Sequence, residues 1–505
     1  MNRRAAWVIA AYALLATIIV PVYPHFPSPN EFTRWAEAAA IVDFRTFEVT
    51  PLLPLLGRDF EDLAVVNGRY FSNKAPGGAF VGLPAYAIAR AFVGPPSPRT
   101  MRITLDAMRL LAATVPVLIL ALLFLRIAAR LGGAQSTTAV TALLFATPLF
   151  AYGMLNFSHA LTAMALFAAW ALLFVRPSPA SDYAAGALIG LAVISEYPAV
   201  IAGAVLIAFA LRQLPRIIAG GAPFAIALAI YNRLLFGSFF ALSSGFERDA
   251  AFRRLATHGL FGVGMPDPVI IARLLFDPGR GLFVFSPVFL IGLAAIPRVR
   301  RALTARQFWS LVLTPLAILL TSAGYPNWHG GWTVGVRYLV PAMPFLALLL
   351  AFAESSWILS LLMGASVAAV VMTSIAFPFV PPNVPVPWGT FAWPMLRHGL
   401  IAPNLFHLIA QPLAIAVPFA IVLVAVLLAT DRRAFVIAGA VACFAIGVAV
   451  PVKPIVAIER AYFEEVAFER DGAIARATPP GMTVKPSFVQ RADDARRMPP
   501  TSWPF

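Results

Sequence analysis

The chain has 505 residues, of which 60% are hydrophobic and only 12% are charged, and its mean hydropathy is +0.81. Soluble domains carry about 25% charged residues, whereas apolar segments of roughly 18 residues or more are typical of helices that cross a membrane. Such segments recur along the whole chain, which excludes a soluble enzyme and a disordered protein. The single cysteine, Cys443, lies inside one of them and excludes a disulfide framework. We therefore expect an all-α polytopic membrane protein.

The net charge of +15 indicates membrane topology rather than nucleic-acid binding. Basic chains often bind phosphate-rich partners, but the Lys and Arg residues of membrane proteins also gather in cytoplasmic loops. Here they cluster in short loops between apolar segments, so we expect no nucleic-acid partner. The clusters are Arg3/Arg4, Arg126/Arg130, Arg176, Arg212/Arg216, Arg298/Arg300/Arg301/Arg306 and Arg432/Arg433.

These clusters share the cytoplasmic side only if the apolar segment 77–93, which contains Pro84 and Arg90, does not cross the membrane. We expect a juxtamembrane helix there, inside a long first periplasmic loop at 24–106. The N-terminus is then cytoplasmic, and about thirteen transmembrane helices remain. They are 5–23, 107–125, 137–155, 158–175, 183–195, 197–211, 216–235, 281–297, 308–324, 339–353, 357–378, 407–430 and 434–451.

Two of these segments, 183–195 and 197–211, are shorter than the ~20 residues that span a bilayer. They are separated by Glu196-Tyr197-Pro198. A carboxylate at mid-membrane is costly, and proline disfavours helix in the residue before it. We therefore expect a helical hairpin with its apex at the outer surface, and one continuous helix is the alternative.

The predicted organisation has two parts. A transmembrane domain occupies 1–451 and includes a second large outer loop at 236–280. A short extramembrane tail at 452–505, partly unordered, follows on the periplasmic side.

The first outer loop begins with an acid beside a base. Ser28 and Pro29 are typical of a helix start, and Glu31 and Arg34 are three residues apart, on one helical face. Two interpretations stay open. The pair is either a solvated ion pair on an interfacial helix, or Glu31 is a general base held near an acceptor hydroxyl.

Further along the loop, Asp62, Tyr70 and Lys74 precede the glycine pair at 77–78. Cations beside a glycine-rich backbone suit phosphate oxygens. The alternative is a loop that returns to the interface, with Lys74 extended toward lipid phosphates.

Three other outward-facing segments carry candidate residues. His159 lies between two spans, where a helix-capping role is the alternative to a functional one. Glu196, with Tyr197 beside it, is an interfacial acid of the kind that marks functional sites. Arg280 follows the second outer loop and is placed to bind an anion, although a solvated loop explains that segment equally well.

The densest cluster is at 324–339 and contains Trp328, His329, Trp332 and Arg337. The tryptophans fit an aromatic belt at the membrane surface. With His329, the adjacent glycines and Arg337, they also suit a pocket for a lipid-linked sugar phosphate, because arginine binds phosphate bidentately.

These segments together resemble bacterial C-type (GT-C) glycosyltransferases, the integral-membrane enzymes that use polyprenyl-phosphate-linked sugars and include aminoarabinose transferases and protein O-mannosyltransferases. The resemblance covers the helix layout over 1–451 and local strings that are uninformative about the sugar. Those strings are Pro29-Asn30-Glu31 with Arg34, Gly68-Arg69-Tyr70-Phe71-Ser72-Asn73-Lys74-Ala75-Pro76-Gly77, Asp277-Pro278-Gly279-Arg280-Gly281, and Trp328-His329-Gly330-Gly331 with Arg337-Tyr338.

The resemblance implies a catalytic role for Glu31 in activating the acceptor, with Lys74 and Arg337 holding the donor phosphate. Relatives often have a second acid in the first loop, for which Asp43, Glu48 and Asp62 are candidates, and we favour Asp62. It also implies a lipid, glycan or protein acceptor, membrane lipids as partners, and a periplasmic active site in the bacterial cytoplasmic membrane. No cofactor is established, and a divalent metal, found in some relatives, stays open.

Two other functions compete with this one. A transporter or flippase of lipid-linked glycans places its polar sites near the membrane midplane, whereas the polar groups here lie at one surface. A glycan polymerase or ligase also has large outer loops, but does not require an acid directly after the first helix.

Overall fold

The computed structural model describes residues 2–26, 28–57, 60–257, 259, 262–482, 484 and 492–493. It consists almost entirely of helices, and the described residues form one two-stranded sheet. The predicted all-α polytopic class is therefore confirmed.

In the first half of the chain, long apolar helices alternate with the elements of the first outer loop. The helices are α1 (Arg3–Ile18), α2 (Pro29–Phe44), α3 (Leu53–Leu56), α4 (Gly77–Val93), α5 (Thr100–Arg109), α6 (Val115–Arg130), α7 (Ser136–Phe145), α8 (Leu149–Tyr152), α9 (His159–Phe174), α10 (Pro179–Ser195), α11 (Ala199–Ala208) and α12 (Leu214–Phe236). The strands are β1 (Leu63–Val66) and β2 (Arg69–Ser72), and the short helical turns are η1 (Thr50–Leu52), η2 (Leu110–Thr114) and η3 (Leu211–Gln213).

The second half begins with the second outer loop and ends with two helices of the tail. The helices are α13 (Ala250–Ala256), α14 (Pro268–Phe276), α15 (Leu282–Phe285), α16 (Phe289–Ala294), α17 (Ile296–Ala302), α18 (Ala305–Ala323), α19 (Met343–Leu350), α20 (Trp357–Ala376), α21 (Trp393–Arg397), α22 (Gln411–Ala429), α23 (Arg433–Ala449), α24 (Pro454–Phe468) and α25 (Ala473–Ala477). The turns are η4 (Ser243–Phe246), η5 (Arg337–Ala342), η6 (Trp388–Ala392) and η7 (Leu405–Leu408).

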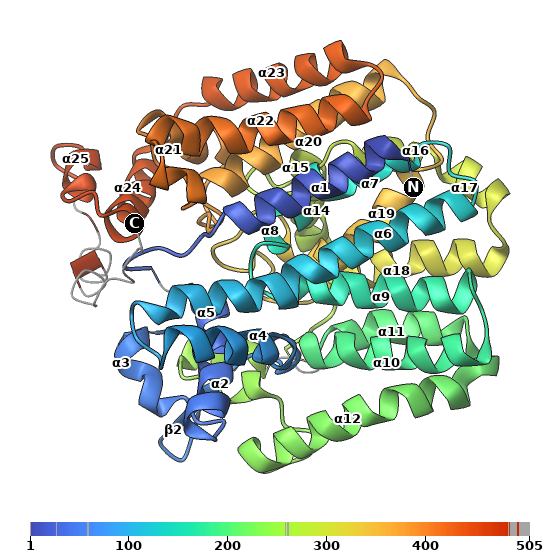
Figure 1. Cartoon of the computed structure of the whole chain (residues 1–505), viewed down its shortest axis with the longest axis horizontal. Helices are drawn as coiled ribbons and strands as arrows, with labels where there is room; N and C mark the ends of the chain where they lie inside the picture. The colour runs from blue at the N-terminus through green and yellow to red at the C-terminus, as the bar shows by residue number, and fades with distance from the viewer. Residues whose placement is uncertain are drawn as a thin grey trace.

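The long helices run alongside one another as a bundle (Figure 1). Elements of the first outer loop, α2, α3 and β2, lie at one end together with α24 and α25, whereas the N-terminus and α17 lie at the other end (Figure 1). The basic clusters predicted for the cytoplasm include Arg3/Arg4 and those of α17, so they fall at the end opposite the first outer loop.

Among the described residues, four helical segments are long and apolar enough to cross a membrane, and the pair α23–α24, bent by 107°, gives a fifth if it is counted as one span. Several other predicted spans consist of shorter helices: 137–155 contains α7 and α8, and 281–297 contains α15 and α16. The number of thirteen crossings therefore stays a prediction.

The segment 77–93 forms α4, which packs against α2 and α5 rather than crossing the bundle alone (Figure 1). Asp43 near the end of α2 accepts hydrogen bonds from Tyr86 Oη at 2.6 Å and Arg90 Nε at 2.6 Å. This contact fixes α4 beside α2 at the end of the molecule that carries the first outer loop.

The helix break at Glu196 is as expected. Helix α10 ends at Ser195 and α11 begins at Ala199. A Cβ atom on Gly203 would lie 2.7 Å from Ile189 Cγ2, so the two helices fold back against each other. The segment 183–211 is a hairpin of two helices, and the continuous helix is excluded.

The described part of the tail packs against the bundle. The Phe463 ring of α24 lies 5.5 Å from that of Phe26, 5.2 Å from Trp332 and 4.9 Å from Phe377, centroid to centroid. The tail is thus more than an appendage over this part. The prediction that part of the tail at 452–505 is unordered stays untested, and residues 483, 485–491 and 494–505 lie outside the described residues.

Candidate active site

A tight β-hairpin brings the polar residues of the first outer loop together. Strands β1 and β2 pair in the register Leu63↔Ser72 and Val66↔Arg69, around Asn67-Gly68, which both have positive φ. An Asn-Gly pair is the preferred two-residue turn for this geometry. Asp62 directly precedes β1, and Asn73 and Lys74 directly follow β2. The register therefore places these three side chains next to one another.

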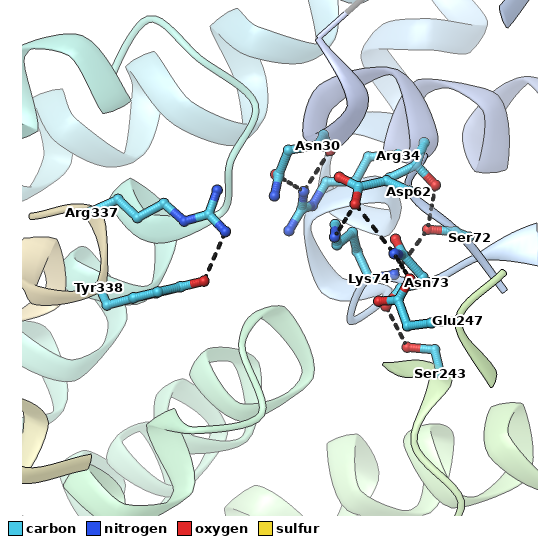
Figure 2. Close-up of polar contacts among 11 residues, drawn as sticks. Asn30, Arg34, Asp62, Ser72, Asn73, Lys74, Ser243, Glu247, Arg337 and Tyr338 are labelled. Carbon is cyan, nitrogen blue, oxygen red and sulfur yellow. Dashed lines mark hydrogen bonds and ion pairs between the residues drawn. The ribbon is translucent and has the colours of Figure 1, made fainter. Parts of the chain in front are cut away.

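The contacts agree with this register. Lys74 Nζ lies 2.9 Å from Asp62 Oδ1, and Asn73 Nδ2 donates to the same oxygen at 3.3 Å. The second outer loop adds another acid, because Asn73 Nδ2 also donates to Glu247 Oε2 at 2.7 Å. We call Asp62, Asn73, Lys74 and Glu247 the carboxylate cluster (Figure 2).

The two acids of the cluster have different proton affinities. Burial would raise the pKa of Asp62, but the adjacent Lys74 ammonium and its hydrogen bonds hold that pKa below the usual value. Burial raises the pKa of Glu247 to about 7, which Lys74 opposes and the charge of Asp62 reinforces. A pair of acids with such separated affinities is typical of sites that transfer protons.

Arg337 and Tyr338, at the start of η5, face this cluster from another part of the chain, and the guanidinium points toward Asn30, Arg34 and Asp62 (Figure 2). Arg337 Nη2 donates to Tyr338 Oη at 2.8 Å, and its guanidinium carbon lies 4.7 Å from the centre of that ring. Its Nε atom is buried and has no hydrogen-bond partner among the described residues.

Gly330 makes room for this arginine. It has a φ of +72°, and a Cβ atom there would lie 2.6 Å from Arg337 Nε. Both the backbone conformation and the close approach require glycine.

Arg34 is a second buried cation with a free donor. It lies on α2, where its Nη1 donates to Asn30 O at 2.7 Å and to the Asn30 side chain. Its Nε atom has no hydrogen-bond partner. Burial lowers the pKa of Arg34 to about 10, so it is charged at neutral pH.

Small residues surround this second cation. A Cβ atom on Gly78, in the first turn of α4, would lie 3.1 Å from Arg34 Nε and 2.1 Å from Ser158 Oγ. Ser158 Oγ is itself buried and has no partner. Arg34 and Arg337, whose charges act on each other, therefore each offer an anion a donor that no described residue satisfies.

Glu31, the predicted base, is not part of the carboxylate cluster. Its side chain is 0% exposed, and Arg109 binds both oxygens, with Nε to Oε1 at 2.8 Å and Nη2 to Oε2 at 2.7 Å. The backbone N–H of Asn156 donates to Oε1 at 2.7 Å. The alternative of a solvated ion pair with Arg34 is wrong, because Arg34 binds Asn30. Both oxygens of Glu31 are thus taken up by contacts within the protein, and its role as a base stays a prediction.

The three candidates for a second acid in the first outer loop contact different residues, and this distinguishes them. Asp43 binds Tyr86 and Arg90, and Glu48 lies 3.7 Å from the exposed Arg69. Asp62 alone among them belongs to the cluster that Arg337 faces.

Nδ1 of His159, the first residue of α9, contacts Oε1 of Glu196, the residue that follows α10. The His159 ring also packs edge-on against Tyr152 at 5.2 Å and Tyr338 at 6.1 Å, centroid to centroid. The pair therefore supports the aromatic ring on which Arg337 stacks. Glu196 also contributes to the electrostatic environment of Arg34.

Tyr197 and Tyr70 contact the second outer loop. Tyr197 Oη lies 3.2 Å from Ser243 Oγ, which donates to Asn73 O at 2.9 Å. The Tyr70 ring lies 5.8 Å below the guanidinium of Arg248. Both residues hold the loop that carries Glu247, and Tyr70 does not join the cluster.

Arg280, Trp328 and His329 build the loop before Arg337. Arg280 is buried and donates to the carbonyl of His329 and to Gly331 O at 3.2 Å. His329 Nδ1 accepts from Gly331 N at 3.0 Å, and burial with the nearby Arg280 lowers the pKa of His329 to about 4. The Trp328 ring lies 5.8 Å from the guanidinium of Arg273. These residues position Arg337 and do not reach the carboxylate cluster.

The sequence missed several residues of this region, above all Arg109, Asn73, Glu247 and Glu37. Glu37 lies one helical turn after Arg34 and accepts from Tyr231 Oη at 2.8 Å. Burial raises the pKa of Glu37 to about 8. The i, i+3 spacing from Arg34 is a sequence signal that could have identified Glu37. Glu247 lies in a loop of mixed charge, and no sequence signal marks it.

Metal binding finds little support in these contacts. Among the described residues there is no group of three or more His, Cys, Asp or Glu side chains that could hold a metal ion. In the carboxylate cluster the ammonium of Lys74 already contacts Asp62, where a divalent ion would have to bind. This set of side chains does not fit a metal.

No protein-family model and no curated protein sequence matches the chain. Solved structures similar to it include the archaeal oligosaccharyltransferase AglB from Archaeoglobus fulgidus in complex with an inhibitory peptide and a dolichol-phosphate, at 13% identity and a TM-score of 0.43, covering 99% of this chain and 61% of that one. Another is the arabinosyltransferase EmbB from Mycobacterium smegmatis, at 14% identity and a TM-score of 0.39, covering 89% of this chain and 41% of that one.

The chain thus spans less than two thirds of the length of each of these structures. Both are glycosyltransferases by name. At TM-scores below 0.5 this likeness carries no argument about activity. The function must be argued from the side chains of this chain.

Proposed function

We propose that the protein is a glycosyltransferase that moves a sugar from a polyprenyl-phosphate donor to a hydroxyl of a lipid, glycan or protein acceptor. The observation that carries the proposal is the placement of two buried cations whose Nε atoms have no partner among the described residues: Arg337 faces the carboxylate cluster, and Arg34 lies beside it (Figure 2). The two arginines suit a phosphate, and the carboxylates suit a group that must lose a proton.

The chemistry follows from this division. The bond that breaks joins the anomeric carbon to a phosphate oxygen, so negative charge grows on the phosphate as it leaves. Arginine donors fixed in a water-poor site stabilise that charge without reorganisation. The acceptor hydroxyl is a weak nucleophile, and a carboxylate that takes its proton in the transition state makes it competent.

The proposed roles follow the contacts. Arg337 and Arg34 bind the donor phosphate, and Lys74 neutralises Asp62 and adds positive charge at the edge of the same site. Asp62, held ionised, orients Lys74 and the acceptor. Glu31 positions α2, which carries Arg34, through its ion pair with Arg109.

We further propose that this site opens on the periplasmic side of a bacterial cytoplasmic membrane, with the membrane domain at 1–451 and the tail at 452–505. The support is the distribution of charge. The first outer loop and the basic loops lie at opposite ends of the bundle (Figure 1), and basic loops face the cytoplasm.

A transporter of lipid-linked glycans is the competing function. Transporter sites are formed by broken helices near the membrane midplane. The carboxylate cluster instead lies on the two outer loops, next to a β-hairpin. We therefore favour transfer over transport.

The experiment is a transfer assay with purified protein in nanodiscs. The donors are polyprenyl monophosphates carrying radiolabelled mannose, glucose, arabinose or 4-amino-4-deoxyarabinose, and a membrane extract supplies the acceptors. We expect transfer from at least one donor and a loss of about 100- to 1000-fold in Arg337→Ala, since that arginine stabilises the leaving phosphate.

Glu48→Gln is the matched control, because it removes a first-loop carboxylate whose contact, Arg69, is exposed. It should transfer at the wild-type rate. Movement of an intact donor across sealed vesicles, without cleavage of the sugar–phosphate bond, would contradict the proposal.

A further inference from the structure

We infer that Glu247, on the second outer loop, is the base that takes the proton from the acceptor hydroxyl. This inference rests on the proposed function and names the group that performs its proton transfer. Nothing in the sequence marks this residue, since its loop mixes acids and arginines.

The backbone fixes Glu247 at the site independently of its side chain. Ala64 of β1 and Glu247 form an antiparallel bridge, and Arg248 N donates to Leu63 O at 2.8 Å. Arg253 Nη1 donates to the carbonyl of Glu247 at 3.2 Å. A loop from the second half of the membrane domain is thereby pinned to the strand that begins directly after Asp62.

The side chain has one fixed and one free oxygen. Glu247 Oε2 accepts from Asn73 Nδ2 at 2.7 Å, whereas Oε1 makes no hydrogen bond within the part of the chain that the structure describes. The residue is 8% exposed, so it is neither open to bulk water nor sealed in the core. An oriented carboxylate with a free oxygen is suited to receive a proton.

The other acids nearby differ from Glu247. Both oxygens of Glu31 are bound by Arg109, and Lys74 and Asn73 both contact Oδ1 of Asp62, where the Lys74 ammonium lowers the pKa of Asp62 and makes it a weaker base. Glu37 is fully buried and is bound by Tyr231 on α12. Oε2 of Glu37 has no hydrogen-bond partner among the described residues, but this side chain is fully buried, whereas Glu247 joins an available oxygen to partial exposure and a pKa near neutral.

The charges around Glu247 also suit a base that works near neutral pH. Lys74 and Asp62 face it from the first outer loop, Asp249 from its own loop, and Tyr325 from the segment after α18. Together with burial, they bring its pKa to about 7. A base is most effective when its pKa lies near the working pH.

The step balances without another reactant. The acceptor oxygen forms a bond to the anomeric carbon as the carbon–oxygen bond to the phosphate breaks. The acceptor proton moves to Glu247, and the electron pair of the broken bond leaves with the polyprenyl phosphate. Glu247 then releases its proton to water before the next turnover.

Azide tests this assignment, because azide is a nucleophile that carries no proton and needs no base. The wild type and Glu247→Gln are incubated with the donor that proves active, with either the membrane extract or sodium azide. Glutamine keeps an oxygen for Asn73, so the loop contact survives the change. Glu247→Asp serves as the conservative variant and Glu48→Gln as the control.

We expect Glu247→Gln to lose about 100- to 10,000-fold of its transfer to hydroxyl acceptors, while it forms glycosyl azide at the wild-type rate. Glu247→Asp should restore part of the hydroxyl transfer. In the wild type, hydroxyl transfer should rise with pH as Glu247 loses its proton near pH 7, and that rise should be absent in Glu247→Gln.

Two results would overturn the assignment. Loss of azide product together with hydroxyl transfer would show that Glu247 only supports donor binding, and unchanged hydroxyl transfer would show that it has no role. A wild type that makes neither product from any donor would overturn the proposed function itself, a failure that is visible before any variant is compared.

Discussion

Two carboxylate sites lie close together in the outer part of this molecule, and they differ in how completely their atoms are satisfied. At the first, Glu31 gives both oxygens to Arg109 and accepts a backbone N–H as well, with no exposed surface. At the second, Glu247 keeps one oxygen free, and Arg34 and Arg337 each keep an unpartnered Nε.

This difference in hydrogen bonding indicates a structural role for Glu31 and a chemical role for Glu247. A buried ion pair with saturated hydrogen bonds holds helices in register, and breaking it leaves an uncompensated charge. A site with unsatisfied donors beside an acid of near-neutral pKa is incomplete without a ligand. Residue type alone does not distinguish the two.

The largest effect on sugar transfer should come from Arg337, which we propose binds the donor phosphate. We predict that Arg337→Lys lowers kcat/KM for the donor about 100-fold or more, because an ammonium cannot reproduce the planar fork of donors. Steady-state transfer in nanodiscs measures this. A lysine variant within threefold of wild type would show that charge alone matters at this position.

A second prediction concerns the proton affinity of Glu247. The negative charge of Asp62 raises its pKa and the positive charge of Lys74 lowers it. Asp62→Asn should therefore shift the low-pH limb of the rate profile below pH 7, and Lys74→Met should shift it above. Both variants should also lose activity, by about 10- to 100-fold. Shifts in one common direction would contradict the assignment of that limb to Glu247.

Substitutions at the Glu31–Arg109 ion pair should change the stability of the folded protein. Glu31→Gln leaves the buried Arg109 charge without a partner, at a cost of about 3–5 kcal/mol. The double variant Glu31→Gln/Arg109→Met removes the charge as well and should recover most of that loss. Thermal unfolding followed by tryptophan fluorescence measures both. Equal destabilisation in the single and double variants would show that the pair does not act as a unit.

The smallest effect is expected at Glu37. Its pKa is about 8 in the folded protein, above the ordinary value, so the folded state holds this proton more tightly than the unfolded state. Its contribution to stability is complete at acid pH and is lost as the pH rises through 8. Glu37→Gln should keep transfer within threefold and flatten this decline. An unchanged pH dependence of unfolding would refute the assignment.

Local sequence signals were enough for much of the helical layout. The charge of Glu196 and the proline after Tyr197 predicted the hairpin of α10 and α11. The need for the basic clusters to share one side of the membrane predicted that 77–93 stays with the first outer loop, and α4 packs against α2 of that loop. Asp62 was favoured because its segment continues to Lys74, and the β-hairpin brings those two together.

The partners of the acids could not be predicted in this way. Arg109 lies 78 residues after Glu31 and was assigned to an apolar span, where nothing marks it as an ion-pair partner. Glu247 reaches the site only because its loop pairs with β1. Contacts of this kind depend on tertiary packing, so the sequence could not show which of the acids has an oxygen left free by its neighbours.

The most direct test compares the two sites in one measurement, the rate of sugar transfer per folded molecule. The variants are Glu31→Gln/Arg109→Met at the saturated site and Glu247→Gln at the open site, assayed in nanodiscs with the same donor and membrane extract. We predict that the double variant retains transfer within about tenfold, while Glu247→Gln loses about 100-fold or more. The reverse order would contradict the account and return the base to Glu31.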